Sequence, residues 1–85
     1  MQKIKTKVTA KSYVRKRSGR FTVKLPKNCV WFDVVNAGTE IMMGDYTLKP
    51  GERFYTKTSL MIRTGIVFSY KKGAAFVLTT EIQQV

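Results

Sequence analysis

Ten of the sixteen basic residues of this 85-residue chain lie within its first 27 positions, and no carboxylate accompanies them. The formal net charge of +11 therefore divides into +10 for residues 1–27 and +1 for residues 28–85, where six basic residues meet five acids. Cationic side chains at this density bind phosphate groups or acidic protein surfaces, and each phosphate contact releases a condensed counterion. The residues expected to contact such a polyanion are Lys3, Lys5, Lys7, Lys11, Arg15, Lys16, Arg17 and Arg20. The alternative is a solvated face that keeps a small protein soluble.

Aromatic side chains near basic ones are the second candidate for binding chemistry, because a ring next to a cation can stack on a nucleobase. Tyr13, Phe21 and Tyr55 each lie close to a lysine or arginine and are the candidates for stacking. The competing interpretation places them in the core, since most aromatic residues of the chain fall in strand patterns. Lys71 and Lys72 form a separate basic point that we assign to solvation of a turn.

The sequence contains few residues of the types that catalysis requires. The chain has no histidine and one cysteine, which excludes an imidazole base, a Ser/His or Cys/His pair and a multi-thiolate metal cluster within one chain. Cys29 is expected to be a small buried hydrophobe, and the glycines fall singly at turns rather than in a phosphate-binding loop. We therefore expect no enzyme activity, no cofactor, no metal and no small-molecule substrate.

Length and composition define the scaffold that must position these side chains. A chain of 85 residues is one domain with a thin margin of stability, and its single cysteine offers no internal disulfide. Its 44% of apolar residues suffice for one core, and its 25% of charged residues suit a soluble, folded protein. No apolar run is long enough to span a bilayer, and the basic start is not followed by an uncharged segment. Membrane insertion and secretion are not expected.

The basic segment itself alternates with a period of two. Lysines dominate the odd positions of residues 3–11, and Ile4 and Val8 occupy even ones. This pattern predicts an extended strand with a wet lysine face and with Ile4 and Val8 on the other side, toward the sheet. A mobile basic loop is predicted around Gly19. Residues 1–20 are accordingly interpreted as a basic arm, either separate from the sheet or contributing its first strand.

The remainder of the chain, residues 21–85, predicts a β-sandwich or a small β-barrel. Short β-branched and aromatic runs recur about every ten residues between turn signals, and no stretch has the periodicity of a helix. Pro50-Gly51 predicts a type II turn, because proline pre-sets φ at the first central position and glycine accepts a positive φ at the second. The segment Cys29–Val35 is apolar at both parities and is predicted to be covered on both faces. The other strands are expected at 21–25, 40–43, 46–48, 53–56, 60–63, 66–70 and 76–80.

One group of turn residues resembles a pattern in small β-sandwich modules of tailed-bacteriophage virion proteins. It comprises the run Val34-Val35-Asn36-Ala37-Gly38-Thr39, then Gly44-Asp45, Leu48, Pro50-Gly51-Glu52 and Phe54. The resemblance covers about 20 of the 85 residues. It implies a capsid decoration or auxiliary subunit without a catalytic site, located in the virion after synthesis in the host cytoplasm. Sheet surfaces would make symmetric contacts, and the arm would reach a neighbouring capsid subunit or packaged DNA.

Two functions from different classes follow from the sequence. The first is a virion structural protein that binds copies of itself or a major capsid protein. The second is a cytoplasmic nucleic-acid-binding β-barrel, OB-like or SH3-like, in which the basic arm follows the phosphate backbone and a sheet aromatic stacks on bases. A third, an inhibitor that occludes a partner's acidic or nucleic-acid surface, also fits the charge.

Overall fold

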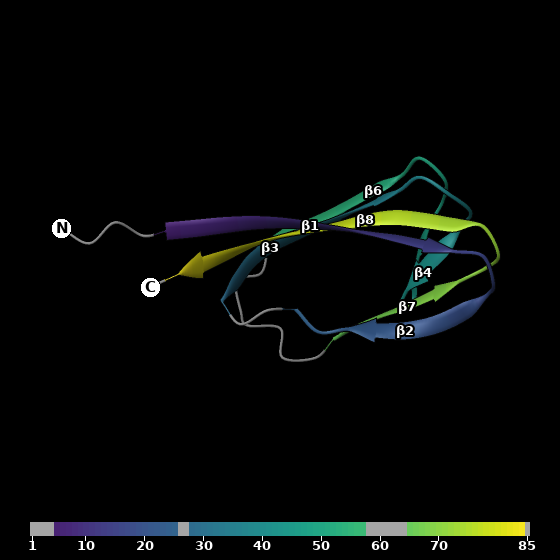
Figure 1. Ribbon diagram of the computed structural model, residues 1–85, viewed down its shortest axis with the longest axis horizontal. Helices are drawn as coiled ribbons and strands as arrows, with labels where there is room; N and C mark the ends of the chain where they lie inside the picture. The colour runs from purple at the N-terminus through teal and green to yellow at the C-terminus, as the bar shows by residue number, and fades with distance from the viewer. Residues whose placement is uncertain (1–4, 26–27, 58–64, 85) are drawn as a thin grey trace.

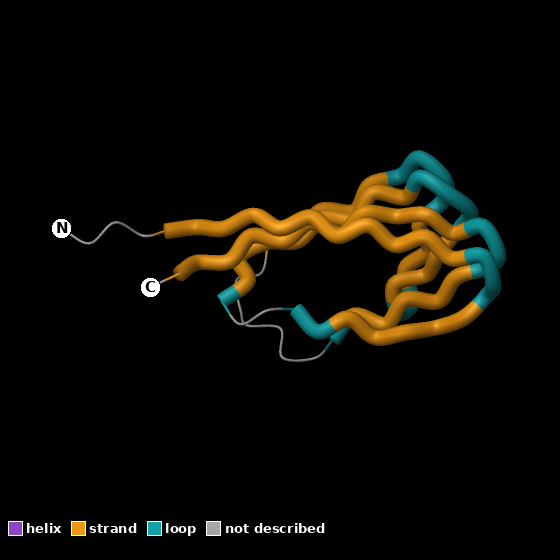
Figure 2. The backbone as a smooth tube through the Cα atoms, viewed as in Figure 1, coloured by secondary structure: helices purple, strands orange, loops and turns teal. Residues whose placement is uncertain are grey.

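The structure is a computed structural model that describes residues 5–25, 28–57 and 65–84. Within these ranges the chain forms eight strands and no helix, which confirms the all-β prediction (Figure 1, Figure 2). The strands are β1 (Lys5–Arg15), β2 (Gly19–Val23), β3 (Cys29–Asn36), β4 (Ile41–Met43), β5 (Tyr46–Leu48), β6 (Arg53–Lys57), β7 (Ile66–Tyr70) and β8 (Ala74–Gln84). The predicted strand at 60–63 and the predicted end of a strand at Pro26 lie outside the described residues.

The strands pair into two antiparallel sheets of four. The first sheet has the order β1-β8-β3-β6 and the second has the order β2-β7-β4-β5. Only β4 and β5 are neighbours both in sequence and in a sheet, and successive strands otherwise alternate between the two sheets. This is the strand order of a jelly roll, a sandwich built from two Greek keys. Of the two architectures that the sequence left open, the structure has the sandwich.

Aromatic side chains join the two sheets at the centre of the core. Tyr13 of β1 stacks on Phe76 of β8 at 5.0 Å between ring centroids, and Phe76 stacks on Phe68 of β7 at 4.9 Å. Phe21 of β2 lies 5.6 Å from Phe68. These rings come from both sheets, so their burial holds the sandwich closed. The other buried apolar members of this core are Phe32, Val34, Ile41, Met43, Leu48, Ala74 and Leu78.

The central strand β3 was predicted to be covered on both faces. In the structure its inner face is fully covered and its outer face is partly covered. Phe32 and Val34 point to the inside of the sandwich and are buried. On the outer face Asp33 is buried, whereas Val35 is 37% exposed. A β-bulge between Cys29 and Trp31 shifts the register of β3 against β8 and ends the regular alternation there.

The basic segment contributes an edge strand to the first sheet. β1 pairs with β8 over its full length, from Lys5↔Gln84 to Arg15↔Ala74. Because the inner face of β8 is apolar, the odd positions of β1 opposite Phe76 and Leu78 point inward, and Tyr13 is only 7% exposed.

The period of two in β1 is thus confirmed, but its predicted orientation is wrong. Val8 and Val14 lie on the outer face and are 58% and 68% exposed, while Lys7 and Lys11 share the face of Tyr13. Alternation shows only that neighbouring side chains take opposite faces, and strand pairing decides which face is covered.

Two turns meet at a corner organised by Asn36. The Asn36 side-chain amide donates hydrogen bonds to the carbonyl oxygens of Thr39 and Leu48, each at 2.9 Å, and its Oδ1 accepts one from Gly38 N at 3.0 Å. The predicted type II turn follows: Gly51 has φ of 84°, and Glu52 N donates to Lys49 O at 3.0 Å, which confirms it.

Several residues behind the sequence resemblance therefore form one connected corner, whereas Gly44 lies in the β4–β5 turn and donates to the Val67 carbonyl oxygen. Gly51 N also donates to the Asn36 carbonyl oxygen at 2.8 Å, and Asn36 N donates to Glu52 O at 3.0 Å. These hydrogen bonds provide partners for backbone groups where the chain crosses from β3 to β4 and back from β5 to β6.

Candidate polyanion-binding surface

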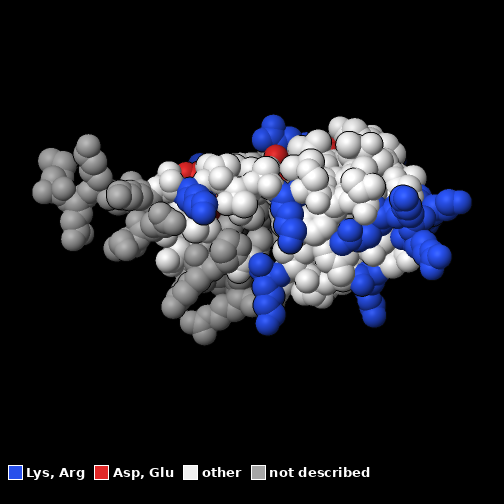
Figure 3. All heavy atoms as spheres, in the orientation of Figure 1, with Lys and Arg blue, Asp and Glu red and all other residues white. Residues whose placement is uncertain are grey.

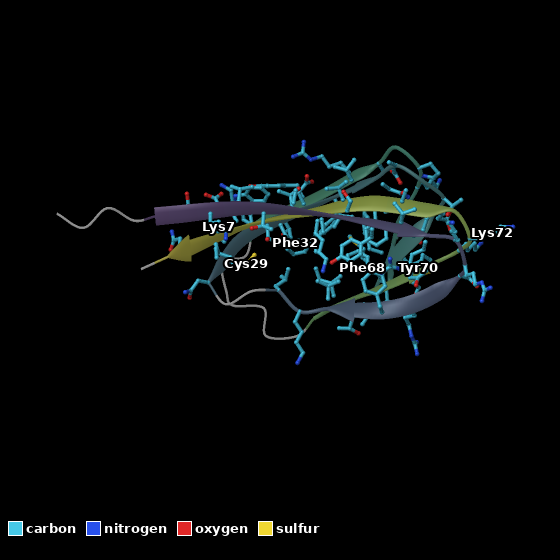
Figure 4. All side chains as sticks on the ribbon, in the orientation of Figure 1. Lys7, Cys29, Phe32, Phe68, Tyr70 and Lys72 are labelled. Atoms are coloured by element: carbon cyan, nitrogen blue, oxygen red, sulfur yellow. The ribbon has the colours of Figure 1, made fainter. Side chains whose placement is uncertain are left out.

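Two loops bring basic residues together at one end of the sandwich. The β1–β2 loop and the β7–β8 turn lie side by side, because Arg15 pairs with Ala74 and Gly19 pairs with Tyr70. The Gly73 amide donates a hydrogen bond to the Arg15 carbonyl oxygen at 3.1 Å, which ties the turn to the end of β1. We call the resulting cluster the cationic end; its members are Arg15, Lys16, Arg17, Arg20, Lys71 and Lys72. Figure 3 shows Lys and Arg side chains gathered at this end of the molecule, and Figure 4 labels Lys72 there.

Carboxylates do not neutralise this cluster within the part of the chain that the structure describes. The one ion pair among those residues joins Arg53 to Asp33, on a different strand pair. Glu40 is the acid that shares a surface depression with the cluster, together with Lys71, and it forms no ion pair among the described residues. Six cations with one nearby acid produce a positive potential that attracts an anionic partner.

Arg15 differs from its neighbours because its guanidinium group lies against the aromatic core. Its Cζ atom is 5.1 Å from the centroid of the Phe21 ring, 5.6 Å from that of Tyr13 and 5.9 Å from that of Tyr70. A guanidinium within about 6 Å of an aromatic face is attracted by the ring quadrupole. Arg15 therefore anchors the base of the cationic end, while Lys16 and Arg17 are exposed to solvent.

The predicted set of eight polyanion contacts is divided by the fold. Four of them, at positions 15, 16, 17 and 20, belong to the cationic end. Lys7 and Lys11 lie further along β1, which at about 3.3 Å per residue places them roughly 26 and 13 Å from Arg15. Lys3 and the side chain of Lys5 lie outside what the structure describes.

Lys71 and Lys72 were assigned to turn solvation, and the structure places them beside the predicted basic loop. No local pattern in the sequence indicates this, because it follows from the pairing of β1 with β8 and of β2 with β7.

The three aromatic candidates for stacking lie in two different environments. Tyr13 is buried and Phe21 is half-buried against the core, and the centroids of their rings are 5.2 Å apart. Their rings belong to the core rather than to a stacking platform, which corrects the expectation for both. Tyr55 is 47% exposed, but it lies on the outer face of β6 beside Trp31, away from the cationic end.

Cys29 has the environment of a structural thiol, as the sequence predicted. It is buried, and its Sγ donates a hydrogen bond to the Trp31 carbonyl oxygen at 3.3 Å. Burial raises the pKa of the Cys29 thiol above its ordinary value of 9.0, and hydrogen bonds with the backbone of Trp31 and Glu81 partly offset this. The thiol is therefore protonated and weakly nucleophilic at neutral pH. The described residues contain no group of three or more potential metal ligands.

Comparison of the chain with protein-family models, with curated proteins and with solved structures finds no match. A helix of the length and apolarity that crossing a membrane requires is absent from the described residues.

Proposed function

We propose that this protein is a non-catalytic structural subunit of a virion, of the capsid decoration or auxiliary kind. Its cationic end binds a polyanion, which is packaged DNA or the acidic surface of a major capsid protein. The observation that carries this proposal is that six basic residues, from two loops and from the adjoining ends of β1 and β2, lie at one end of a rigid sandwich. Because these loops are held by strand pairing, their charges are already positioned before a partner binds.

The jelly-roll strand order supports the virion assignment. Viral capsid domains commonly use this architecture, although lectins and cupins use it as well. Because one fold hosts several functions, the charged surface is the feature of this chain that specifies a polyanionic partner. In this chain the fold provides flat sheet surfaces and the loops provide the charge.

The outer face of the first sheet suits contacts between subunits. Val8 and Val14 of the edge strand β1 are exposed there, as are Val35 of β3 and Tyr55 of β6. On this face Val14 lies opposite Ala75 and Ala10 opposite Thr79, whereas Val8 lies opposite Glu81. A sheet face on which exposed apolar side chains lie among polar and charged ones supports docking of a copy of the chain or of a capsid protein.

The alternative function, a nucleic-acid-binding β-barrel, loses two of its supports. OB-folds are five-stranded barrels, whereas this chain has two separate four-stranded sheets. Of its expected stacking residues, Tyr13 and Phe21 belong to the core. Phosphate binding without base contacts remains compatible with the cationic end and is part of the proposed function.

Binding to duplex DNA at increasing salt tests the proposal. If the cationic end contacts about four phosphates, affinity falls about 150-fold between 50 and 200 mM salt on the B-DNA slope. The variant K16Q/R17Q/K71Q/K72Q is expected to lose this salt-dependent binding, whereas the control K49Q/K57Q, with exposed lysines elsewhere, retains it.

Binding to a polyglutamate matrix, measured in parallel, distinguishes an acidic protein surface from DNA. Failure of the native protein to bind either polyanion at low salt would overturn the proposal. So would equal loss of binding in the K49Q/K57Q control. Assembly is tested separately: a protein that sediments as a monomer at all concentrations and never copurifies with particles contradicts the virion assignment.

A further inference from the structure

A second group of lysines surrounds a pocket at the opposite end of the sandwich from the cationic end. The pocket has a volume of about 310 Å³ and opens between the inner face of β1 and β8 and the segment that follows β2. Lys7 and Lys11 line it from β1, and Lys24 lines it from the other side. In the strand register Lys7 lies opposite Ile82 and Lys11 opposite Leu78, so ammonium groups and apolar side chains alternate across one surface.

The unequal lengths of the two sheets create this pocket. β1 and β8 each have 11 residues, whereas β2 and β7, which face them in the second sheet, have five. The inner face of the first sheet consequently extends beyond the end of the second, as Figure 1 shows for β1 and β8 relative to β2. Figure 4 labels Lys7 on this extension. A lysine on the inner face of a strand is tolerated here because no strand of the second sheet covers it among the described residues.

The apolar wall of the pocket is continuous with the core. Tyr13 and Leu78 line it and are 7% and 4% exposed, respectively. Val23 and Leu25 line the opposite side and also pack against the core cluster. A ligand that enters the pocket therefore meets ordered hydrocarbon and an aromatic ring rather than mobile surface side chains.

The polar lining of the pocket is cationic. Among the described side chains that line it, three are lysines and none is acidic. The hydroxyl-bearing residues Thr9 and Thr80, which lie directly opposite each other in the β1–β8 register, add hydrogen-bonding capacity. Lys11 Nζ lies 5.4 Å from the centroid of the Tyr13 ring, so one cation already lies at the boundary between the polar and apolar parts.

We infer that this pocket binds a small organic anion with an apolar body, such as a medium-chain or aromatic carboxylate. The acid group pairs with an ammonium group from the set Lys7, Lys11 and Lys24, and the body packs on Tyr13 and Leu25. The volume lies at the lower end of the range for small-molecule sites, about 300–1,000 Å³, which fits a single short chain or a ring system. The lysines that line the pocket are not members of the cationic end, so this site goes beyond the proposed function.

Fluorescence of 8-anilinonaphthalene-1-sulfonate measures this site directly, because the probe combines a sulfonate with an apolar ring system. The native protein is expected to bind the probe in a saturable manner. Octanoate should displace it, while 1-octanol, which lacks the charge, and acetate, which lacks the chain, should not. Displacement by 1-octanol equal to that by octanoate would overturn the role of the lysines, and displacement by acetate equal to that by octanoate would overturn the role of the apolar wall.

Matched variants locate the site. The variant K7Q/K11Q/K24Q is expected to weaken probe binding about tenfold, the loss of roughly one charge-assisted contact. The control K49Q/K57Q removes exposed lysines that belong neither to the pocket nor to the cationic end, and it should bind the probe normally. Equal affinity of the two variants overturns the assignment.

Because partly unfolded proteins also bind this probe, the near-ultraviolet circular dichroism of each variant must match that of the native protein. If K7Q/K11Q/K24Q loses this signal, Leu25→Ser provides a second test. This variant makes the apolar wall polar, and octanoate should no longer displace the probe from it.

Discussion

The Arg15 guanidinium lies over the ring of Phe21, 5.1 Å from its centroid, although the two residues belong to strands of different sheets. This contact connects the basic β1–β2 loop to the aromatic core. One arginine of the cationic end is thus also part of the packing of the sandwich, whereas its neighbours contribute charge alone.

Replacing Arg15 is therefore expected to affect stability as well as polyanion binding. Arg15→Gln removes a cation from three aromatic rings and should lower the free energy of unfolding by about 1 kcal/mol. Arg17→Gln, an exposed member of the same loop, should change it by less than about 0.5 kcal/mol. Urea denaturation of both variants measures the difference. Equal stabilities would show that the contact of Arg15 with the rings contributes nothing.

Asn36 is expected to be the most sensitive polar residue of the fold. Asn36→Asp replaces the amide that donates to the Thr39 and Leu48 carbonyl oxygens with a carboxylate oxygen that faces them, in a site that is 1% exposed. We expect a loss of roughly 3 kcal/mol, because buried donors are lost and a charge is buried. Thermal unfolding measures this loss of stability. The matched control Asn28→Asp, at an exposed position with φ of 69°, should be nearly neutral, and comparable losses in both would contradict the role of the corner.

Replacing Arg53 alone should lower stability more than replacing both partners of the ion pair on the outer face of the first sheet. Arg53 Nε donates to Asp33 Oδ1 at 2.7 Å, and the carboxylate is buried while the arginine is largely exposed. Arg53→Gln should cost about 1 kcal/mol, since it leaves a buried charge without its cation. Adding Asp33→Asn to that variant should recover part of the loss, which a double-mutant cycle in urea detects. Lys57→Gln on the same strand serves as the control. A double variant less stable than Arg53→Gln alone would contradict this account.

The Cys29 thiol should resist alkylation until the pH is above its ordinary pKa. Burial raises the pKa of this thiol in the folded protein, so at pH values near 9.0 the unfolded chain carries more thiolate than the folded one. The stability contributed by the protonated thiol is consequently present below pH 9.0 and is lost as the pH rises through the higher folded pKa. Iodoacetamide labelling rates across this range, in buffer and in denaturant, measure the shift. Identical pH profiles in the two states would contradict the burial of the thiol.

Strand positions and turns were readable from the sequence because they depend on local chemistry. Alternation identified β1, and the β-branched and aromatic run identified β3. Pro50-Gly51 specified its turn through proline's fixed φ and glycine's tolerance of a positive one. The charge asymmetry and the burial of Cys29 also followed from residue types alone.

Tertiary structure decided which face of β1 is inside and which basic residues come together. Tyr13 points into the core because it lies opposite Phe76 in β8, a residue 63 positions away in the chain. That pairing directs Lys7 and Lys11 inward, toward the pocket, and exposes Val8 and Val14. The same non-local pairing places Lys71 and Lys72 beside the β1–β2 loop. Sequence periodicity fixes the separation of the two faces of a strand, but only the partner strand determines which of them is covered.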